Sequence, residues 1–173
     1  QPNSFLVLNS LGSEYNTIGK PNDGITYLNR AIAVAPNYYK AYYNRGLSYM
    51  QLQQFKNALN DLDKAISLHR RGDHYKSYVA RGNVYYQLKD MPKAIEDAKT
   101  ALVIDPENVK AMYRWGIANH RLEKTKKAII KLKKALKIYA NDASAFVSLG
   151  FAQLDLGEEH DAIENFEQAI EIN

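Results

Sequence analysis

The sequence predicts an all-α protein that is built as a linear array of five helix pairs. Three observations predict this fold class: a glycine recurs every 34 to 36 residues, small residues follow each glycine at fixed offsets, and branched aliphatic residues stand between them. Small side chains recur where two helices approach closely, and aliphatic ones recur where the space between helices must be filled. The registered columns are Gly12, Gly46, Gly82, Gly116 and Gly150; Gly24, Ala58, Ala94, Ala128 and Ala162; Ala31, Ala65, Ala101, Ala135 and Ala169; and Ile18, Leu52, Leu88, Leu122 and Leu156.

The central repeat shows the helix–turn–helix pattern most clearly. We predict its first helix over Tyr78–Leu88 and its second helix from Pro92 to about Ile104, with a turn between them. Proline suits the first turn of a helix, because the missing N–H would have no partner there. Pro106 then ends the second helix, since proline cannot continue a helical hydrogen-bond pattern.

The other repeats follow the same pattern along the chain. We place a lead-in at residues 1–4 and one domain over residues 5–173, with repeats at about 5–38, 39–72, 75–108, 109–142 and 143–173. In the first repeat Gly24 replaces the alanine of the other repeats, which costs about 1 kcal/mol of helix propensity. We therefore expect a looser second helix in that repeat. The two-residue insertion within His69–His74 holds two histidines, but its adjacent arginines argue against a metal site.

Composition sets the broad class of the protein. With 173 residues, of which 46% are hydrophobic and 24% charged, the chain is long enough for a folded body with a continuous core. No apolar run approaches the roughly 20 residues of a membrane span, and no secretory signal is evident. The absence of cysteine excludes disulfides and thiolate chemistry. These features do not determine the compartment of the protein, and we expect the cytoplasm.

No group of residues in the sequence carries a recognisable catalytic motif. The serine-hydrolase elbow, the glycine-rich phosphate loop and the paired-histidine zinc motif are all missing from the chain. The recurring glycines are packing residues and not a ligand cradle. We therefore predict a protein without enzymatic activity, without a cofactor and without a bound metal.

The repeat resembles the tetratricopeptide repeat, a helix–turn–helix unit of about 34 residues. Tyr78, Gly82, Tyr85, Ala94, Ala101 and Pro106 match its aromatic, glycine, alanine and proline positions. The resemblance covers residues 5 to 173, nearly the whole chain. It implies a right-handed superhelical solenoid of five antiparallel helix pairs that acts as a protein–protein interaction scaffold.

In proteins of this family the first helices of successive repeats line a concave groove, and the resemblance implies which residues face it here. The groove would combine a ladder of lysines with aromatic and aliphatic side chains. Such a surface suits an extended or helical peptide with apolar anchors and acidic residues, or a free C-terminal carboxylate. The predicted groove residues are Lys40, Tyr43, Asn44, Lys76, Asn83, Tyr86, Lys110, Tyr113, Arg114, Ile117 and Arg121, with Leu47, Met50, Gln87, His120, Phe151 and Leu154 in the same columns.

A chaperone adaptor is one alternative function. The chaperone co-factors of this family hold a terminal carboxylate with five polar residues, and Lys110 with Arg114 resembles one part of that clamp. A frame shifted back by one repeat retains Asn44 and Lys76 instead. Each frame supplies two of the five residues, so the clamp is incomplete.

Two further alternatives concern the last two repeats. The last repeat lacks a polar capping helix, so that Ala169, Ile170 and Ile172 would form an exposed edge. That edge would pack on a second copy of the chain or belong to a longer protein. The second helix of the fourth repeat is rich in lysine and that of the fifth is rich in carboxylates. We expect these helices to be neighbours that neutralise each other, which argues against a nucleic-acid or membrane patch.

Overall fold

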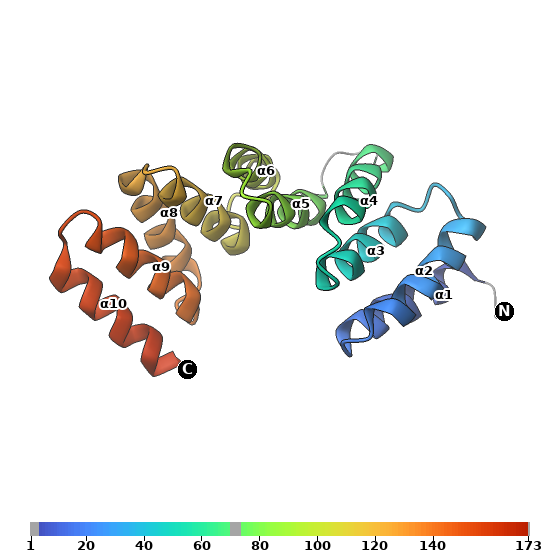
Figure 1. The fold of residues 1–173 in the computed structure, drawn as a ribbon, viewed down its shortest axis with the longest axis horizontal. Coiled ribbons are helices and arrows are strands. Elements are labelled where there is room, and N and C mark those ends of the chain that lie inside the picture. Colours follow the sequence, from blue (N-terminus) through green and yellow to red (C-terminus); the bar gives the residue numbers. More distant parts are fainter. Residues whose placement is uncertain (1–3, 70–73, 173) are drawn as a thin grey trace. The chain divides into compact units, whose positions relative to one another are not determined.

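The computed structural model describes residues 4–69 and 74–172, and within them every regular element is a helix (Figure 1). The all-α array of helix pairs is therefore confirmed. In chain order the ten helices of the described residues are α1 (Phe5–Thr17), α2 (Pro21–Val34), α3 (Tyr39–Gln51), α4 (Phe55–Leu68), α5 (Tyr75–Gln87), α6 (Met91–Ile104), α7 (Val109–Arg121), α8 (Thr125–Ile138), α9 (Ala143–Leu154) and α10 (Glu159–Ile172). Helix α5 begins three residues before the predicted start at Tyr78, and α6 begins one residue before Pro92.

The helices form two compact units, residues 1–84 and residues 85–173, which we call the first and the second unit. In the first unit α1 packs on α2, α2 on α3, and α3 on α4, while α1 also touches α3. In the second unit α6 packs on α7, α7 on α8, α8 on α9, and α9 on α10, while α7 also touches α9. Two pairs of first helices from neighbouring repeats, α1 with α3 and α7 with α9, are therefore in direct contact. A single domain over residues 5–173 stays a prediction.

The glycine column marks the closest approach between the two helices of a repeat. A Cβ atom on Gly12 would lie 2.5 Å from Cγ of Leu28, and one on Gly116 would lie 2.8 Å from Cγ of Leu132. Both distances are too short for two carbon atoms, so any larger residue would push the paired helices apart. The interpretation of this column as a packing column is confirmed at these positions.

A looser second helix in the first repeat stays a prediction, but the structure gives Gly24 a packing role. Helix α2 has 14 residues, the same length as α4, and Gly24 is buried within it. A Cβ atom on Gly24 would lie 2.6 Å from Oδ1 of Asn16. The glycine replaces alanine because the buried amide of Asn16 occupies the space that an alanine methyl group would need.

The turn between the two helices of each repeat has the same backbone conformation in all five repeats. One residue of each turn has φ between 57° and 75°, in the left-handed region. In the central repeat, Lys89 N donates to Tyr86 O at 3.0 Å and Asp90 N donates to Tyr85 O at 2.9 Å, which is the Schellman arrangement of a helix C-terminus. The left-handed residues are Gly19, Gln53, Lys89, Glu123 and Gly157.

The predicted exposed edge of the last repeat is only partly present. Ile170 is exposed, but Ala169 is buried, because it belongs to the small-residue column that is buried in every repeat. Ile172 is half-buried. Among the described helices, none is both long and apolar enough to cross a membrane.

Candidate functional site

The predicted groove residues lie on three first helices and are divided between the two units. The first unit holds Lys40, Tyr43 and Asn44 on α3 with Lys76 and Asn83 on α5, and the second holds Tyr86 on α5 with Lys110, Tyr113, Arg114, Ile117 and Arg121 on α7. All three lysines are exposed. A continuous ladder of cations along the two units stays a prediction.

In the first unit, two predicted groove residues are held by contacts within the protein. The side-chain amide of Asn44 donates from Nδ2 to Oδ1 of Asn9 at 2.9 Å, which joins α3 to α1. The ring of Tyr43 lies edge-on to the ring of His74, with 5.1 Å between centroids, and burial raises the pKa of Tyr43. Asn44 and Tyr43 therefore fasten neighbouring helices and are less available to a ligand than their column suggests.

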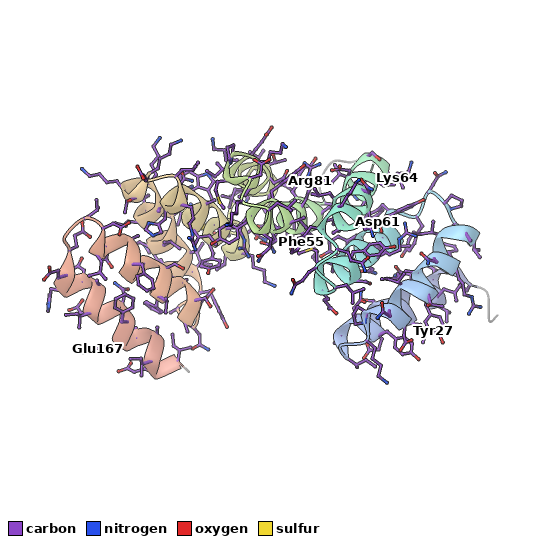
Figure 2. All side chains as sticks on the ribbon, viewed as in Figure 1. Tyr27, Phe55, Asp61, Lys64, Arg81 and Glu167 are labelled. Atoms are coloured by element: carbon purple, nitrogen blue, oxygen red, sulfur yellow. The ribbon has the colours of Figure 1, made fainter. Side chains whose placement is uncertain are left out.

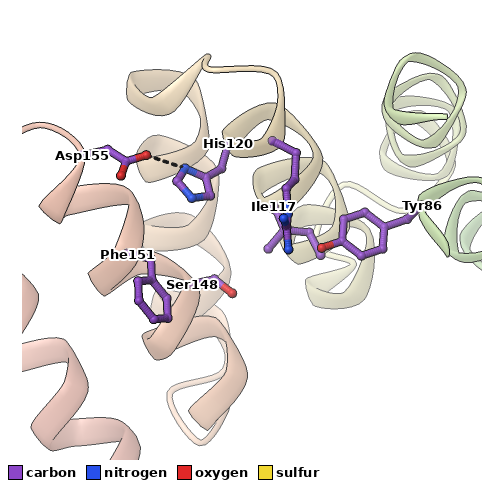
Figure 3. A pocket seen from close by; sticks show the side chains of 7 residues that line it. Tyr86, Ile117, His120, Ser148, Phe151 and Asp155 are labelled. Carbon is purple, nitrogen blue, oxygen red and sulfur yellow. Dashed lines mark ion pairs between the residues drawn. The ribbon is translucent and has the colours of Figure 1, made fainter. Parts of the chain in front are cut away.

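In the second unit, a pocket of about 360 Å³ opens between α5, α7 and α9, and we call it the α7–α9 pocket (Figure 3). Its apolar side chains, Ile117 and Phe151, come from α7 and α9, and the ring of Tyr86 lies on the α5 side. Three predicted groove residues, Tyr86, Ile117 and Arg121, meet here. The lining residues are Tyr86, Ile117, His120, Arg121, Ser148, Phe151 and Asp155.

Two lining residues, Ser148 and Asp155, were not predicted from the sequence to face the groove. Both stand in columns that already supplied groove residues, since Ser148 corresponds to Arg114 and Asp155 corresponds to Arg121 one repeat earlier. Extending those columns into the fifth repeat would have found them. Ser148 and Asp155 are not cationic, whereas their counterparts Arg114 and Arg121 are. The pattern of lysines and arginines therefore did not indicate them.

Arg114 is a half-buried cation that lies against two aromatic rings. Its guanidinium carbon is 4.9 Å from the ring centroid of Tyr86 and 5.7 Å from that of Tyr113. Its Nε is buried without a hydrogen-bond partner, and no carboxylate among the described residues forms an ion pair with it. Burial lowers the pKa of Arg114, but a guanidinium remains charged at neutral pH. The site therefore holds a positive charge that no anion of the described chain balances.

His120 and Asp155 place an imidazole beside a carboxylate at the α7–α9 pocket. Nδ1 of His120 lies 3.5 Å from Oδ2 of Asp155, as the dashed line in Figure 3 marks. This Nδ1 atom makes no hydrogen bond. An ion pair forms only when the imidazole is protonated. The pocket is thus lined by one carboxylate, Asp155 at the C-terminal end of α9, and by the cation Arg121 on α7.

A metal site receives no support from the described residues. Residues 4–69 and 74–172 contain no group of three or more histidines and carboxylates that could hold a metal ion. His69 and His74 pack together, with 5.5 Å between ring centroids. The rest of the insertion that they flank, residues 70–73, lies outside the described residues.

Comparison with known proteins identifies the repeat. Family models described as tetratricopeptide repeat match residues 7–38, 39–71, 75–108, 110–142 and 143–173. A search of curated protein sequences gave no match.

Several solved structures share the fold. MamA from Desulfovibrio magneticus RS-1 is 20% identical, with a TM-score of 0.84 over 97% of this chain and 94% of that one. A further MamA crystal structure is 22% identical, with a TM-score of 0.80 over 93% of each chain. YrrB, described as a TPR protein with an unusual peptide-binding site, is 16% identical, with a TM-score of 0.77 over 100% of this chain and 88% of that one. Identities this low show the fold alone. Together, the five registered repeats, the packing at the glycine column and the matching family models show that the chain belongs to the tetratricopeptide repeat family.

Proposed function

We propose that this protein is a non-catalytic interaction scaffold that binds an acidic peptide segment in the groove of its second unit. The observation that carries this proposal is Arg114, a half-buried guanidinium without an anionic partner among the described residues. Removing a charge from water is costly unless a counter-charge joins it. A carboxylate of a bound peptide would supply that counter-charge.

The neighbouring groups suit the other parts of such a peptide. A guanidinium binds a carboxylate through two parallel hydrogen bonds, which gives orientation as well as affinity. Lys110 is exposed one helical turn before Arg114 and adds positive charge to the approach. An apolar side chain next to the carboxylate would enter the α7–α9 pocket, against Ile117 and Phe151. YrrB, which shares this fold, is described as having an unusual peptide-binding site, and this supports a peptide-binding role.

The carboxylate can come from a side chain or from a C-terminus. The five-residue clamp of the chaperone adaptors is not what we propose, because Asn44 is hydrogen-bonded to Asn9 and Tyr43 packs on His74. Recognition would instead depend on the single cation Arg114, supported by Lys110 and Arg121. An amidated peptide and its free acid distinguish the two sources directly.

Selection from a library of short random peptides, displayed with free C-termini, tests this proposal on the full chain. We expect the selected peptides to be enriched in Asp or Glu beside Leu or Phe. The affinity of a synthetic binder, measured by fluorescence anisotropy, should fall about tenfold or more in the Arg114→Gln variant, because a desolvated charge pair is lost. Reversing both charges, in Lys110→Glu with Arg114→Glu, should weaken binding by roughly a few kcal/mol.

The matched control is Arg30→Gln, which also removes an arginine that lies over a tyrosine, Tyr27, at 5.9 Å. Arg30 belongs to α2 of the first unit, so its loss should leave the affinity unchanged. Binders that lack carboxylates, equal affinity for the Arg114→Gln variant, or no binder at all would contradict the proposal.

A further inference from the structure

Helices α8 and α10 carry opposite charges, and the described residues leave most of them without an ion pair. Helix α8 contains six lysines and no carboxylate, and α10 contains five carboxylates and no lysine or arginine. Such complete separation of sign on two helices of one unit creates two strong fields of opposite sign, which is unusual for surfaces that serve only solubility.

The two helices flank a second pocket, which we call the α8–α10 pocket. Its volume is about 290 Å³, and its lining comes from three helices: Lys133 and Leu136 from α8; Phe146, Leu149 and Gln153 from α9; and Asp161, Glu164 and Asn165 from α10. The pocket therefore has a basic side, an acidic side and apolar side chains contributed by α9. None of its residues lines the α7–α9 pocket.

A buried amide holds the acidic side in place. Gln153 of α9 is fully buried; its Nε2 donates to Oδ2 of Asp161 at 3.0 Å, and its Oε1 accepts from Nδ2 of Asn165 at 2.7 Å. Both partners belong to α10. Because both hydrogen bonds anchor α10 to a buried group, the carboxylate of Asp161 keeps a defined position beside the pocket.

Among the described residues, a single long contact pairs a charge of α8 with a charge of α10. Nζ of Lys133 lies 4.0 Å from Oδ2 of Asp161, with both side chains about half exposed. In the described part of the chain, no other lysine of α8 forms an ion pair with a carboxylate of α10. Lys126, Lys127, Lys134 and Lys137 are exposed, as are Glu159, Glu164, Glu167 and Glu171. The expected neutralisation across the α8–α10 seam is therefore mostly unfulfilled.

We propose that the α8–α10 surface binds the same surface of a second copy of this chain. The argument is charge complementarity, because each copy carries both the basic and the acidic half of the interface. A two-fold axis that runs between α8 and α10, along the direction of the helices, places α8 of one copy on α10 of the other, and does so twice. An axis across the helices would instead oppose like charges, so electrostatics selects one arrangement.

A nucleic acid or an anionic membrane is a poorer partner for this surface. Either one would meet the lysines of α8, but it would also meet the carboxylates of α10 across a pocket that both helices line. Like charges at that distance repel, and the described residues offer no row of exposed aromatic side chains on α8 for bases to stack on. The second copy alone matches both signs.

Light scattering coupled to size exclusion, over a concentration series of the full chain, tests the proposal. We expect a mass that rises toward twice 19.7 kDa at low salt. Raising the salt from about 0.05 M to about 0.5 M should weaken the dimer about tenfold or more, because exposed charges are screened.

A charge exchange between the two helices gives the sharper test. Lys134→Glu with Lys137→Glu makes α8 less basic, and Glu164→Lys with Glu167→Lys makes α10 less acidic. Each double variant alone should be monomeric, whereas an equimolar mixture should restore a dimer, because each α8 then faces a complementary α10. Circular dichroism checks that both variants remain helical. Lys56→Glu with Lys64→Glu on α4 is the matched control for the α8 variant, because it changes the net charge by the same amount and in the same direction.

Three results would overturn this proposal. They are a monomer at every concentration, a dimer that persists in either double variant alone, and a mixture that stays monomeric. Binding of RNA or of vesicles rich in phosphatidylserine by a monomeric wild-type chain, lost with Lys134→Glu and Lys137→Glu, would assign α8 to a polyanion instead. None of these results bears on the peptide groove around Arg114, so the two proposals can fail separately.

Discussion

Arg45 and Asp61 show how one residue pair fastens the two helices of a repeat. Nε and Nη2 of Arg45 donate to the two carboxylate oxygens of Asp61 at 2.7 Å each, and this bidentate contact raises the pKa of Arg45. Asp61, labelled in Figure 2, belongs to α4. Nη1 of Arg45 also donates to Oδ1 of Asn29 in the preceding helix α2 at 2.6 Å. The pair therefore joins α2, α3 and α4. Two repeats later, at the same two positions, Nζ of Lys131 lies 5.2 Å from the ring centroid of Trp115, so a cation–π contact replaces the ion pair.

The different burial of two aspartates on α4 predicts different costs when each is removed. The side chain of Asp61 is 8% exposed, whereas that of Asp63, which pairs with Arg81 at 2.7 Å, is 53% exposed. Asp61→Ala should destabilise the protein by about 2–3 kcal/mol, because it leaves a partly buried guanidinium without its partner. Asp63→Ala should cost below about 1 kcal/mol. Urea denaturation followed by circular dichroism measures both, and equal costs would show that burial of the pair is unimportant.

At the scale of the element, the start of α6 depends on one capping residue. Oδ1 of Asp90 accepts from the backbone N–H of Lys93 at 3.3 Å, and Oδ2 lies 2.8 Å from Nζ of the same lysine. The hydrogen bond from the Lys93 side chain, together with that from its backbone, lowers the pKa of Asp90 below its ordinary value of 3.8. The charged carboxylate therefore stabilises the first turn of the helix.

This lowered pKa makes the stability of α6 depend on pH in a defined direction. A group whose pKa is lower in the folded state stabilises the protein above its unfolded-state pKa, and that contribution disappears as the pH falls through the folded-state value. Wild type should therefore be more stable than Asp90→Asn near neutral pH. The difference should shrink as the pH falls below 3.8 and vanish once the pH is below the lower folded-state pKa of Asp90. Asp90→Ala, which also removes the cap, should cost about 1 kcal/mol at neutral pH. Thermal unfolding of the three proteins across this pH range measures the effect, and a difference that grows on acidification would contradict it.

At the scale of the whole molecule, an isoleucine at one position of the repeat is buried in the fourth repeat and exposed in the fifth. Ile129 on α8 is 8% exposed, because α9 of the following repeat packs on α8, whereas the equivalent Ile163 on α10 is 54% exposed. Among the described helices, only α9 packs on α10. The same residue type at the same repeat position therefore contributes differently to stability, depending on which repeat of the array it belongs to.

Substitution of these two isoleucines should separate packing from helix propensity. Ile129→Ala should destabilise the protein by about 2–4 kcal/mol, because it opens a cavity between α8 and α9. Ile163→Ala should change the stability by less than about 1 kcal/mol, since the side chain is already half in water. Denaturation of both variants, with Trp115 fluorescence as the reporter for the second unit, gives the comparison. Equal losses would mean that α10 is covered by another copy or partner under the conditions of measurement.

The sequence by itself determined the repeat, the helices and the close approach of each pair. These features depend on steric rules that act over short spacings, such as the small residue at Gly116 opposite Leu132 and the proline at the start of α6. The left-handed conformation of the turn residues Gln53, Lys89 and Glu123 was not predicted, because only glycine indicates that conformation in a sequence.

The tertiary structure decided which residues of the predicted groove columns have a partner within the fold. Asn44 is engaged by Asn9, 35 residues earlier, and Arg114 lies on Tyr86, 28 residues earlier, without meeting a carboxylate. Column position sets the direction of a side chain, but its availability depends on neighbours contributed by other repeats. A polar group that is already hydrogen-bonded within the fold gains little by binding a ligand. A cation that has no anionic partner within the fold can still bind an anion.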